Sequence, residues 1–145
     1  GYERYEGYRK ALKENGMKVD ETYIRITDWE EINEGYSATL DLIQSKEENL
    51  SALFYANSQL LLGGYKAIHE LKLNIPNNLS IVSFDRPFTI DALIPHPTTL
   101  GAMEKKIALA AAKLLYLRII KKNTNKPREI RVKSSICEGE SCCRR

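Results

Sequence analysis

The stretch Leu79 to Asp85, LSIVSFD, decides how this chain folds. Its first six residues are mostly apolar or β-branched, which predicts a short strand buried on both faces, and the run ends in a carboxylate. Two similar runs precede it, Thr22 to Thr27 and Leu50 to Ala56. Asp28 follows the first of these and Asn57 follows the second. The sequence therefore repeats one unit, a strand that ends in a group able to bind a polar ligand.

Helical patterns lie between these strands. Apolar residues at near-helical spacing predict helices from Tyr2 to Asn15, from an N-cap at Asp28 onward, and from Ser58 to Leu71. Downstream we expect an irregular segment at Arg86 to Pro97, a short strand at Thr98 to Leu100, a long helix at Met103 to Lys121 and a final strand at Glu129 to Ile136. Strands that alternate with helices form parallel sheets with right-handed crossovers. The predicted fold is α/β, with a doubly wound, mainly parallel sheet.

The polar residues after the strands are candidates for one binding site. Ligands of open α/β sheets bind beyond the carboxyl ends of the strands, so Asp28, Asn57 and Asp85 are expected to converge. Arg4 joins them, because a cation in the first turn of a helix meets the positive end of the helix dipole and does not stabilise the helix. Simpler explanations stay open at this point. Asn57 and Asp85 would also serve as helix N-caps, and Trp29 as a partly buried packing residue.

Composition argues against several classes of protein. The chain has 145 residues, 43% of them hydrophobic, which is enough for one domain with a core. Its 22 Lys and Arg residues against 19 Asp and Glu residues give a net charge of +3, too even for a nucleic-acid surface. No apolar run reaches the roughly 20 residues of a membrane span. The cysteines Cys137, Cys142 and Cys143 and the histidines show no zinc-site spacing, so we expect neither a metal nor a cofactor.

An α/β enzyme is an alternative that the motifs disfavour. No glycine-rich phosphate loop follows a predicted strand. His69 lies among charged residues of a predicted helix, His96 lies between two prolines, and neither has a nucleophile as an evident partner. We therefore assign no catalytic residue.

A longer, ordered set of residues resembles a known family. The set runs through Arg4, Gly7, Tyr8, Ala11, Leu12 and Gly16, then Ala56 and Asn57, then Gly63 and Ala67, then Ile75 to Asp85, and last Pro97, Thr98 and Thr99. It resembles the effector-binding core of lactose-repressor and galactose-repressor type (LacI/GalR) transcription regulators, and more distantly that of periplasmic sugar-binding proteins. The resemblance extends from about Glu3 to Ser141.

The resemblance implies roles for the candidate residues. Arg4, Asn57 and Asp85 would bind the hydroxyl groups of an effector, a sugar or a related metabolite, because together they offer hydrogen-bond donors and acceptors to vicinal hydroxyls. Trp29 would stack on the sugar ring, and Asp28 is a further candidate. Arg86 stands where the family often has an acidic or polar residue, and it would instead suit an anionic effector such as a sugar phosphate.

The resemblance also implies how the protein is organised. Residues 1–145 would be a partial effector-binding domain from which the DNA-binding headpiece is absent. The helix at 102–125 would belong to a missing N-terminal subdomain, and we expect it to pack on the retained sheet or to exchange with a neighbouring chain. Effector binding would change the rotation between subdomains through unequal affinity for two states, with Pro97 to Leu100 in the hinge.

The expected partners follow from the same resemblance. The family dimerises partly through the segments that here are Gln59 to Leu71 and Pro87 to Ile94, so a homodimer is expected. The apolar residues exposed on these segments would be Tyr65, Phe88, Ile90, Leu93 and Ile94. Operator DNA would be bound through the headpiece, in the cytoplasm and with no membrane contact. A periplasmic sugar-binding protein of a transport system is the alternative.

Overall fold

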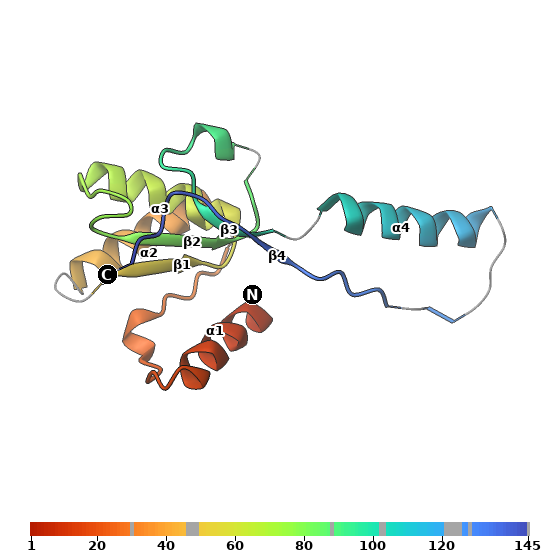
Figure 1. The fold of residues 1–145 in the computed structure, drawn as a ribbon, viewed down its shortest axis with the longest axis horizontal. Helices are drawn as coiled ribbons and strands as arrows, with labels where there is room; N and C mark the ends of the chain where they lie inside the picture. Colours follow the sequence, from red (N-terminus) through yellow and green to blue (C-terminus); the bar gives the residue numbers. More distant parts are fainter. Residues whose placement is uncertain are drawn as a thin grey trace.

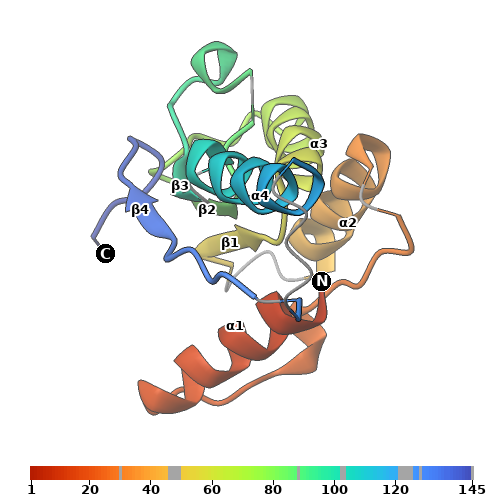
Figure 2. The ribbon, with the colours of Figure 1, turned by 90° about the vertical axis from the view of Figure 1, so that its right-hand side faces the viewer.

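A four-stranded sheet with the order β1-β2-β3-β4 organises the molecule. The computed structural model describes residues 1–29, 31–45, 50–87, 89–101, 104–120, 126–127 and 129–144. β1 (Ala52–Tyr55), β2 (Ser80–Phe84) and β3 (Thr98–Gly101) are parallel, and β4 (Ser135–Cys137) is antiparallel to β3. α2 (Ile32–Ser45) and α3 (Ser58–Glu70) cover one face, while α1 (Tyr2–Glu14) lies beside β1, away from them (Figures 1 and 2). The predicted α/β fold with a mainly parallel sheet is confirmed.

The core lies between the sheet and the pair α2 and α3. Side chains alternate along β1, so Leu53 and Tyr55 point into the core while Phe54 points toward α1. The rest of the core consists of Leu42, Leu61, Tyr65, Ile68, Leu79 and Ile81. Burial raises the pKa of Tyr55, whose hydroxyl lies 2.9 Å from that of Thr39. Both hydroxyls thus enter the core as a hydrogen-bonded pair, which avoids the cost of an unpaired polar group.

Glycines let α2 and α3 approach each other backbone to backbone. A Cβ at Gly63 would overlap the carbonyl oxygen of Ile32, and a Cβ at Gly35 would overlap the backbone of Leu60. Gly64 similarly leaves room for the ring of Tyr55. The paired glycines of α3 therefore serve contacts inside one chain rather than between subunits.

We expect Gly63→Ala to lower the free energy of unfolding by about 1–3 kcal/mol, because the added methyl group would force α2 and α3 apart. Urea unfolding followed by circular dichroism measures the change. The matched control is Gly7→Ala on α1, where nothing lies within 4 Å of the new Cβ. That control should gain up to about 1 kcal/mol from helix propensity. Equal effects of the two substitutions would contradict the tight α2–α3 contact.

The chain after β4 bonds to the start of β2, ahead of the residues that pair with β3. The carbonyl oxygen of Ser141 accepts a hydrogen bond from the N–H of Ile81 at 2.8 Å. Its buried hydroxyl accepts from the N–H of Thr98 at 2.8 Å and donates to the carbonyl oxygen of Ile81. The predicted final strand, Glu129 to Ile136, was thus placed too early along the chain, because pairing begins only at Ser135 and continues past it.

The predicted strand from Thr22 to Thr27 is wrong. A short 3-10 helix, η1 (Glu21–Tyr23), occupies its start, and the Asp20 carboxylate accepts hydrogen bonds from the N–H and hydroxyl of Thr22 at 2.9 and 2.7 Å. The guanidinium of Arg25 donates to the carbonyl oxygens of Thr22 and Ile24. These side chains thus form hydrogen bonds with backbone groups that would otherwise pair with a neighbouring strand. The predicted N-cap at Asp28 is also wrong, because α2 begins at Ile32.

The long helix α4 (Glu104–Ile119) projects away from the sheet (Figure 1). Its apolar side chains Leu109, Leu115 and Ile119 are exposed. The expectation that this helix packs on the retained sheet is therefore wrong, and exchange with a neighbouring chain stays a prediction. Within the described ranges, no helix is long and apolar enough to cross a lipid bilayer.

Candidate functional site

An ion pair joins α1 to the end of β2. Nη2 of Arg4 lies 3.2 Å from Oδ2 of Asp85, and the two side chains are 28% and 31% exposed. Nη1 of Arg4 donates a hydrogen bond to the carbonyl oxygen of Ala56, and the guanidinium carbon lies 4.0 Å from the centre of the Phe84 ring. These contacts account for a cation in the first turn of α1, where the helix dipole disfavours it.

Asp85 takes an unusual backbone conformation directly after β2. Its φ of +67° lies in the left-handed region, which costs a non-glycine residue roughly 1–2 kcal/mol. Its N–H donates to the carbonyl oxygen of Leu100 at 3.0 Å, which fixes the turn against β3. Asp85 does not cap a helix, because the next helical turn, η2 (Ile90–Ala92), has Thr89 at its N-cap. Strained residues of this kind are enriched at binding sites, and the binding role of Asp85 stays a prediction.

Asn57 lies at the amino end of α3 and is only 5% exposed. Its Oδ1 accepts a hydrogen bond from the N–H of Leu60 at 2.9 Å, so the interpretation as an N-cap is confirmed. The amide nitrogen Nδ2, however, is buried and has no hydrogen-bond partner among the described residues. A buried donor without a partner costs roughly 1–3 kcal/mol, and such a group in a native structure requires an explanation beyond capping.

The structure brings Arg4, Asn57 and Asp85 to the same end of the sheet, where the parallel strands β1 and β2 terminate. Arg4 contacts Asp85 directly and reaches the carbonyl group of Ala56, the residue before Asn57. Sequence reasoning missed the platform beneath Arg4, which consists of that carbonyl and the Phe84 ring. A backbone carbonyl such as that of Ala56 leaves no pattern in the side chains, so the sequence could not reveal it. The aromatic residue at the end of the strand, Phe84, was a usable signal, because aromatic rings attract cations.

The remaining candidates do not join this cluster. Trp29 is 69% exposed and Asp28 is also exposed, and neither has a hydrogen bond or ion pair to the cluster within the described residues. Arg86 is 53% exposed and lies 3.8 Å from the Asp91 carboxylate. The binding roles of these residues stay predictions.

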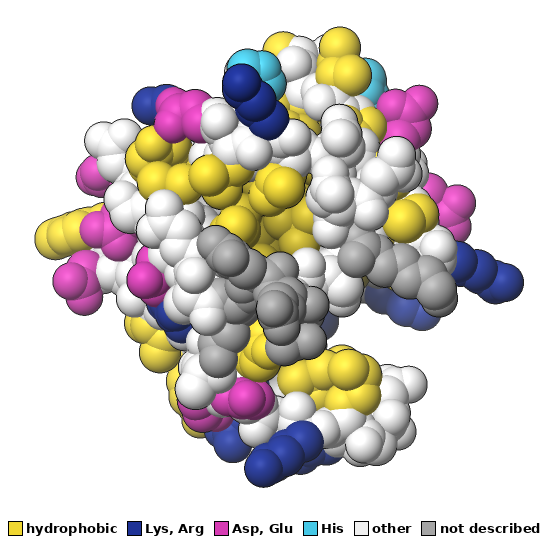
Figure 3. Space-filling view, turned by 90° about the vertical axis from the view of Figure 1, so that its left-hand side faces the viewer, with side chains coloured by type: hydrophobic (Ala, Val, Ile, Leu, Met, Phe, Trp, Pro, Cys, Tyr) yellow, Lys and Arg dark blue, Asp and Glu magenta, His cyan; other side chains and the backbone are white. Residues whose placement is uncertain are grey.

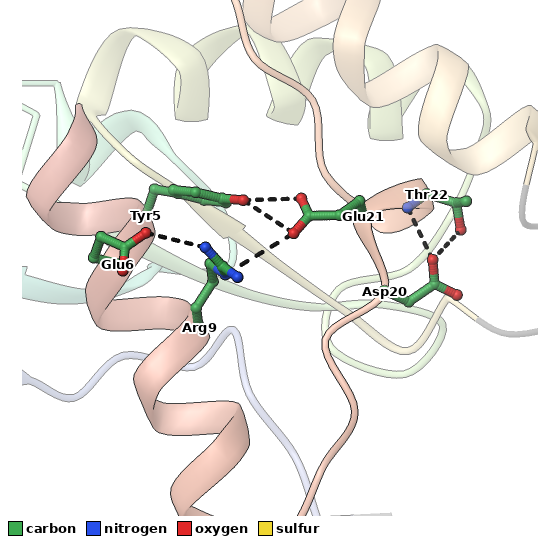
Figure 4. Close-up of polar contacts among 6 residues, drawn as sticks. All are labelled: Tyr5, Glu6, Arg9, Asp20, Glu21 and Thr22. Atoms are coloured by element: carbon green, nitrogen blue, oxygen red, sulfur yellow. Dashed lines mark hydrogen bonds and ion pairs between the residues drawn. The ribbon is translucent and has the colours of Figure 1, made fainter.

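Among the described residues, side-chain contacts hold α1, and with it Arg4, against the rest of the molecule, and no backbone–backbone hydrogen bond joins α1 to a strand or another helix. No residue of α1 is fully buried, and a notch separates the helix from the rest of the molecule (Figure 3). The Tyr5 hydroxyl donates to the Glu21 carboxylate, with distances of 3.0 and 2.9 Å to its two oxygens, and Arg9 lies 3.9 Å from the same carboxylate (Figure 4). The hydrogen bond to Glu21 raises the pKa of Tyr5. Tyr8 stacks on Phe54 of β1, with ring centres 6.5 Å apart.

We expect Tyr8→Ala to loosen α1, because it removes the only aromatic stack between α1 and β1 within the described part of the chain. Amide hydrogen exchange in α1 should become roughly two- to tenfold faster, in line with the usual strength of an aromatic pair. Tyr2→Ala is the matched control, because Tyr2 lies on the same helix and is exposed. Unchanged exchange in the Tyr8 variant would show that polar contacts alone hold α1.

The surfaces predicted for dimerisation differ in part from expectation. Tyr65 and Ile90 are buried rather than exposed, and the Tyr65 hydroxyl donates to the carbonyl oxygen of Pro95 at 2.8 Å. Leu93 is half-buried and packs against the core, whereas Ile94 is 83% exposed. Phe88 lies outside the described residues. Tyr65 was misjudged because the loop after β2 returns to α3, where Pro95 accepts the hydrogen bond from its hydroxyl.

Other features of the surface lie apart from the cluster. Open hollows of about 420 Å³ run along α2 beside Arg25 to Thr27 and along α1 beside Glu6 to Lys10. Cys137, Cys142 and Cys143 are exposed free thiols, and the described ranges contain no group of three or more potential metal ligands. Neither hollow is lined by Arg4, Asn57 or Asp85.

Comparison with known proteins places the chain in a family. The model of the periplasmic binding protein-like domain matches residues 1–142. The chain belongs to this family. The family's open α/β architecture agrees with the sheet described above, and the match ends one residue after Ser141, which bonds to the start of β2 in that sheet.

Relatives within the family confirm the predicted resemblance to LacI-type regulators. The HTH-type transcriptional regulator MalR of Clostridium butyricum is 29% identical over 140 residues, 96% of this chain and 40% of MalR. A LacI-family regulator structure from Sanguibacter keddieii is 26% identical, with a TM-score of 0.86 over 95% of this chain and 51% of its own. A LacI-family regulator from Enterococcus faecium, solved with bound ribose, is 24% identical and has a TM-score of 0.83. The match covers 96% of this chain and 50% of that one. The chain thus spans about 40% of MalR and about half of each solved chain.

Proposed function

We propose that this chain is the effector-sensing part of a LacI-type transcription regulator, in which Arg4, Asn57 and Asp85 bind a sugar or a related metabolite. One observation carries the proposal: a buried, unpaired amide donor lies at the same sheet edge as an ion pair that is accessible to solvent. The relatives support it, since MalR is a transcription regulator and the Enterococcus faecium protein was solved with ribose.

The chemistry of the three groups suits a polyol. Within the part of the chain that the structure describes, Nδ2 of Asn57 is a donor without a partner, and the ion pair with Arg4 is made by Oδ2 of Asp85. The carboxylate of Asp85 can accept a further hydrogen bond through Oδ1. A hydroxyl group both donates and accepts, so neighbouring hydroxyls could satisfy the amide and the carboxylate together. Binding would then relieve the unpaired amide, and this would contribute to affinity.

Signal transmission is proposed from the relatives, of which this chain spans about 40% to 51%. Residues 1–145 would supply one wall of the effector cleft, and the helix at 102–125 would pack in the second subdomain. An effector that binds one arrangement of the subdomains more tightly would shift their equilibrium. The regulator would act in the cytoplasm as a homodimer, bind operator DNA through its headpiece and carry out no catalysis.

A thermal-shift panel of sugars, sugar phosphates and nucleobases tests the proposal. A ligand present at about 100 times its dissociation constant stabilises the folded form by roughly 2.7 kcal/mol, which corresponds to roughly 5–10 °C for a chain of this size. Asp85→Ala should abolish the shift, because it removes both the acceptor and the partner of Arg4.

The control for this experiment is Asp91→Ala, which removes an exposed carboxylate of the neighbouring loop and should leave the shift unchanged. A shift that survives in Asp85→Ala would show that the ligand binds elsewhere. A panel without any hit would remove the support for sugar sensing by this chain.

A further inference from the structure

The chain after β4 crosses the start of β2 as a short strap, residues 141–143. Ser141 anchors the strap, because its carbonyl oxygen accepts a hydrogen bond from the N–H of Ile81 at 2.8 Å and its buried hydroxyl donates to the carbonyl oxygen of the same residue. The thiol of Cys142 donates to that carbonyl oxygen too, at 3.3 Å. Cys142 is nevertheless exposed, so a small reagent can reach a thiol that is bonded to an inner strand of the sheet.

Cys143 extends the strap toward the segment that precedes β2. Its N–H donates a hydrogen bond to the hydroxyl oxygen of Ser80 at 3.4 Å, and its thiol donates to the carbonyl oxygen of Pro76 at 3.5 Å. Cys143 is also an exposed free thiol. Two adjacent cysteines thus donate S–H groups to two different backbone carbonyls beside the start of β2, and each S–H is a weak donor.

A disulfide between adjacent cysteines is strained. Cys142 and Cys143 are joined by a trans peptide bond, across which consecutive Cα atoms lie about 3.8 Å apart. Ordinary disulfides join Cα atoms that are roughly 4.4–6.8 Å apart. Strained and exposed disulfides are reduced more easily than structural ones. A bond between these two sulfurs would therefore form under an oxidant and be reversed by thiols.

We propose that Cys142 and Cys143 form a reversible oxidation site for hydroperoxides, and that oxidation loosens the strap from β2. Hydrogen peroxide transfers one oxygen atom to a thiol, which becomes a sulfenic acid, and is itself reduced to water. The sulfur of the neighbouring thiol then attacks the sulfenic sulfur, so that the S–S bond forms, the S–O bond breaks and a second water leaves. The two thiols together lose two hydrogen atoms and two electrons.

The third thiol of the chain lacks this arrangement. Cys137 lies on β4 opposite Thr99, and neither of its neighbours in sequence is a cysteine. The pair on the strap lies at the amino end of β2, whereas Asp85 follows its carboxyl end. The oxidation site therefore does not rest on the proposed function, and Cys137 provides a matched control for it.

The disulfide would change the strap because it has no S–H group. Both thiol hydrogen bonds, to the carbonyl oxygens of Ile81 and Pro76, would be lost. Closing the ring would also turn the backbone at Cys143, whose N–H bonds to Ser80. Ser141 alone would then hold the strap, and the hydrogen bond between its carbonyl oxygen and the N–H of Ile81 would open more often.

Mass spectrometry of the 145-residue chain tests the chemistry. Dilute hydrogen peroxide should remove the mass of two hydrogen atoms, proteolysis should place the new bond between Cys142 and Cys143, and dithiothreitol should restore the original mass. Cys143→Ser should stop at a sulfenic acid on Cys142, which dimedone captures. Cys137→Ser is the matched control: it removes the other exposed thiol and should be oxidised like the unmodified chain.

Hydrogen exchange tests the consequence for the sheet. The amide of Ile81 should exchange roughly two- to tenfold faster in the oxidised chain than in the reduced one, the size expected when a few weak hydrogen bonds are lost. The amide of Leu42 on α2 is the internal reference and should keep its rate. The double variant Cys142→Ser with Cys143→Ser should show no change on treatment with peroxide.

Four results would overturn the inference. They are a covalent dimer as the main oxidation product, a disulfide that includes Cys137, thiols of the strap that stay reduced in peroxide, and an unchanged exchange rate at Ile81 once the bond between Cys142 and Cys143 has formed. Peptide mapping and exchange of the unmodified chain decide the matter even if a serine variant fails to fold.

Discussion

The ion pair between Arg4 and Asp85 is the contact on which the candidate site depends. It connects a helix that buries no residue of its own to the end of a central strand. A half-exposed pair of this kind is worth at most about 1 kcal/mol by itself. The site is therefore held by several modest contacts that act together, including the Ala56 carbonyl, the Phe84 ring and the stack of Tyr8 on Phe54.

Much of this fold was predictable because burial leaves a pattern in the sequence. The runs that became β1 and β2 are apolar, and the polar residues after them do lie at one edge of the sheet. Thr22 to Thr27 shows the limit of such reasoning. Its composition suits a strand, but the Asp20 carboxylate accepts a hydrogen bond from the N–H of Thr22, and the Arg25 guanidinium donates one to the carbonyl oxygen of Thr22. Composition does not encode such local competition for backbone groups.

The site was predictable only in part, for a related reason. Asn57 and Asp85 could be placed because strand ends converge, whereas the exposure of Trp29 and the pairing of Arg86 depend on loops whose path follows from tertiary contacts. Tyr65 illustrates the opposite error. It was expected to be an interface residue, yet the segment at Pro95 covers its hydroxyl.

The position of Ser141 sets a condition on how the sheet can form during synthesis. Its backbone and hydroxyl engage groups of Ile81 and Thr98 that belong to central strands. Those strands are made long before Ser141 leaves the ribosome, whose exit tunnel shields the most recently added residues. The backbone groups of Ile81 and Thr98 that bind Ser141 therefore lack this partner until Ser141 has been synthesised. Unpaired strand groups can pair with other chains, so the order of synthesis leaves this part of β2 and β3 open to wrong pairing until Ser141 is in place.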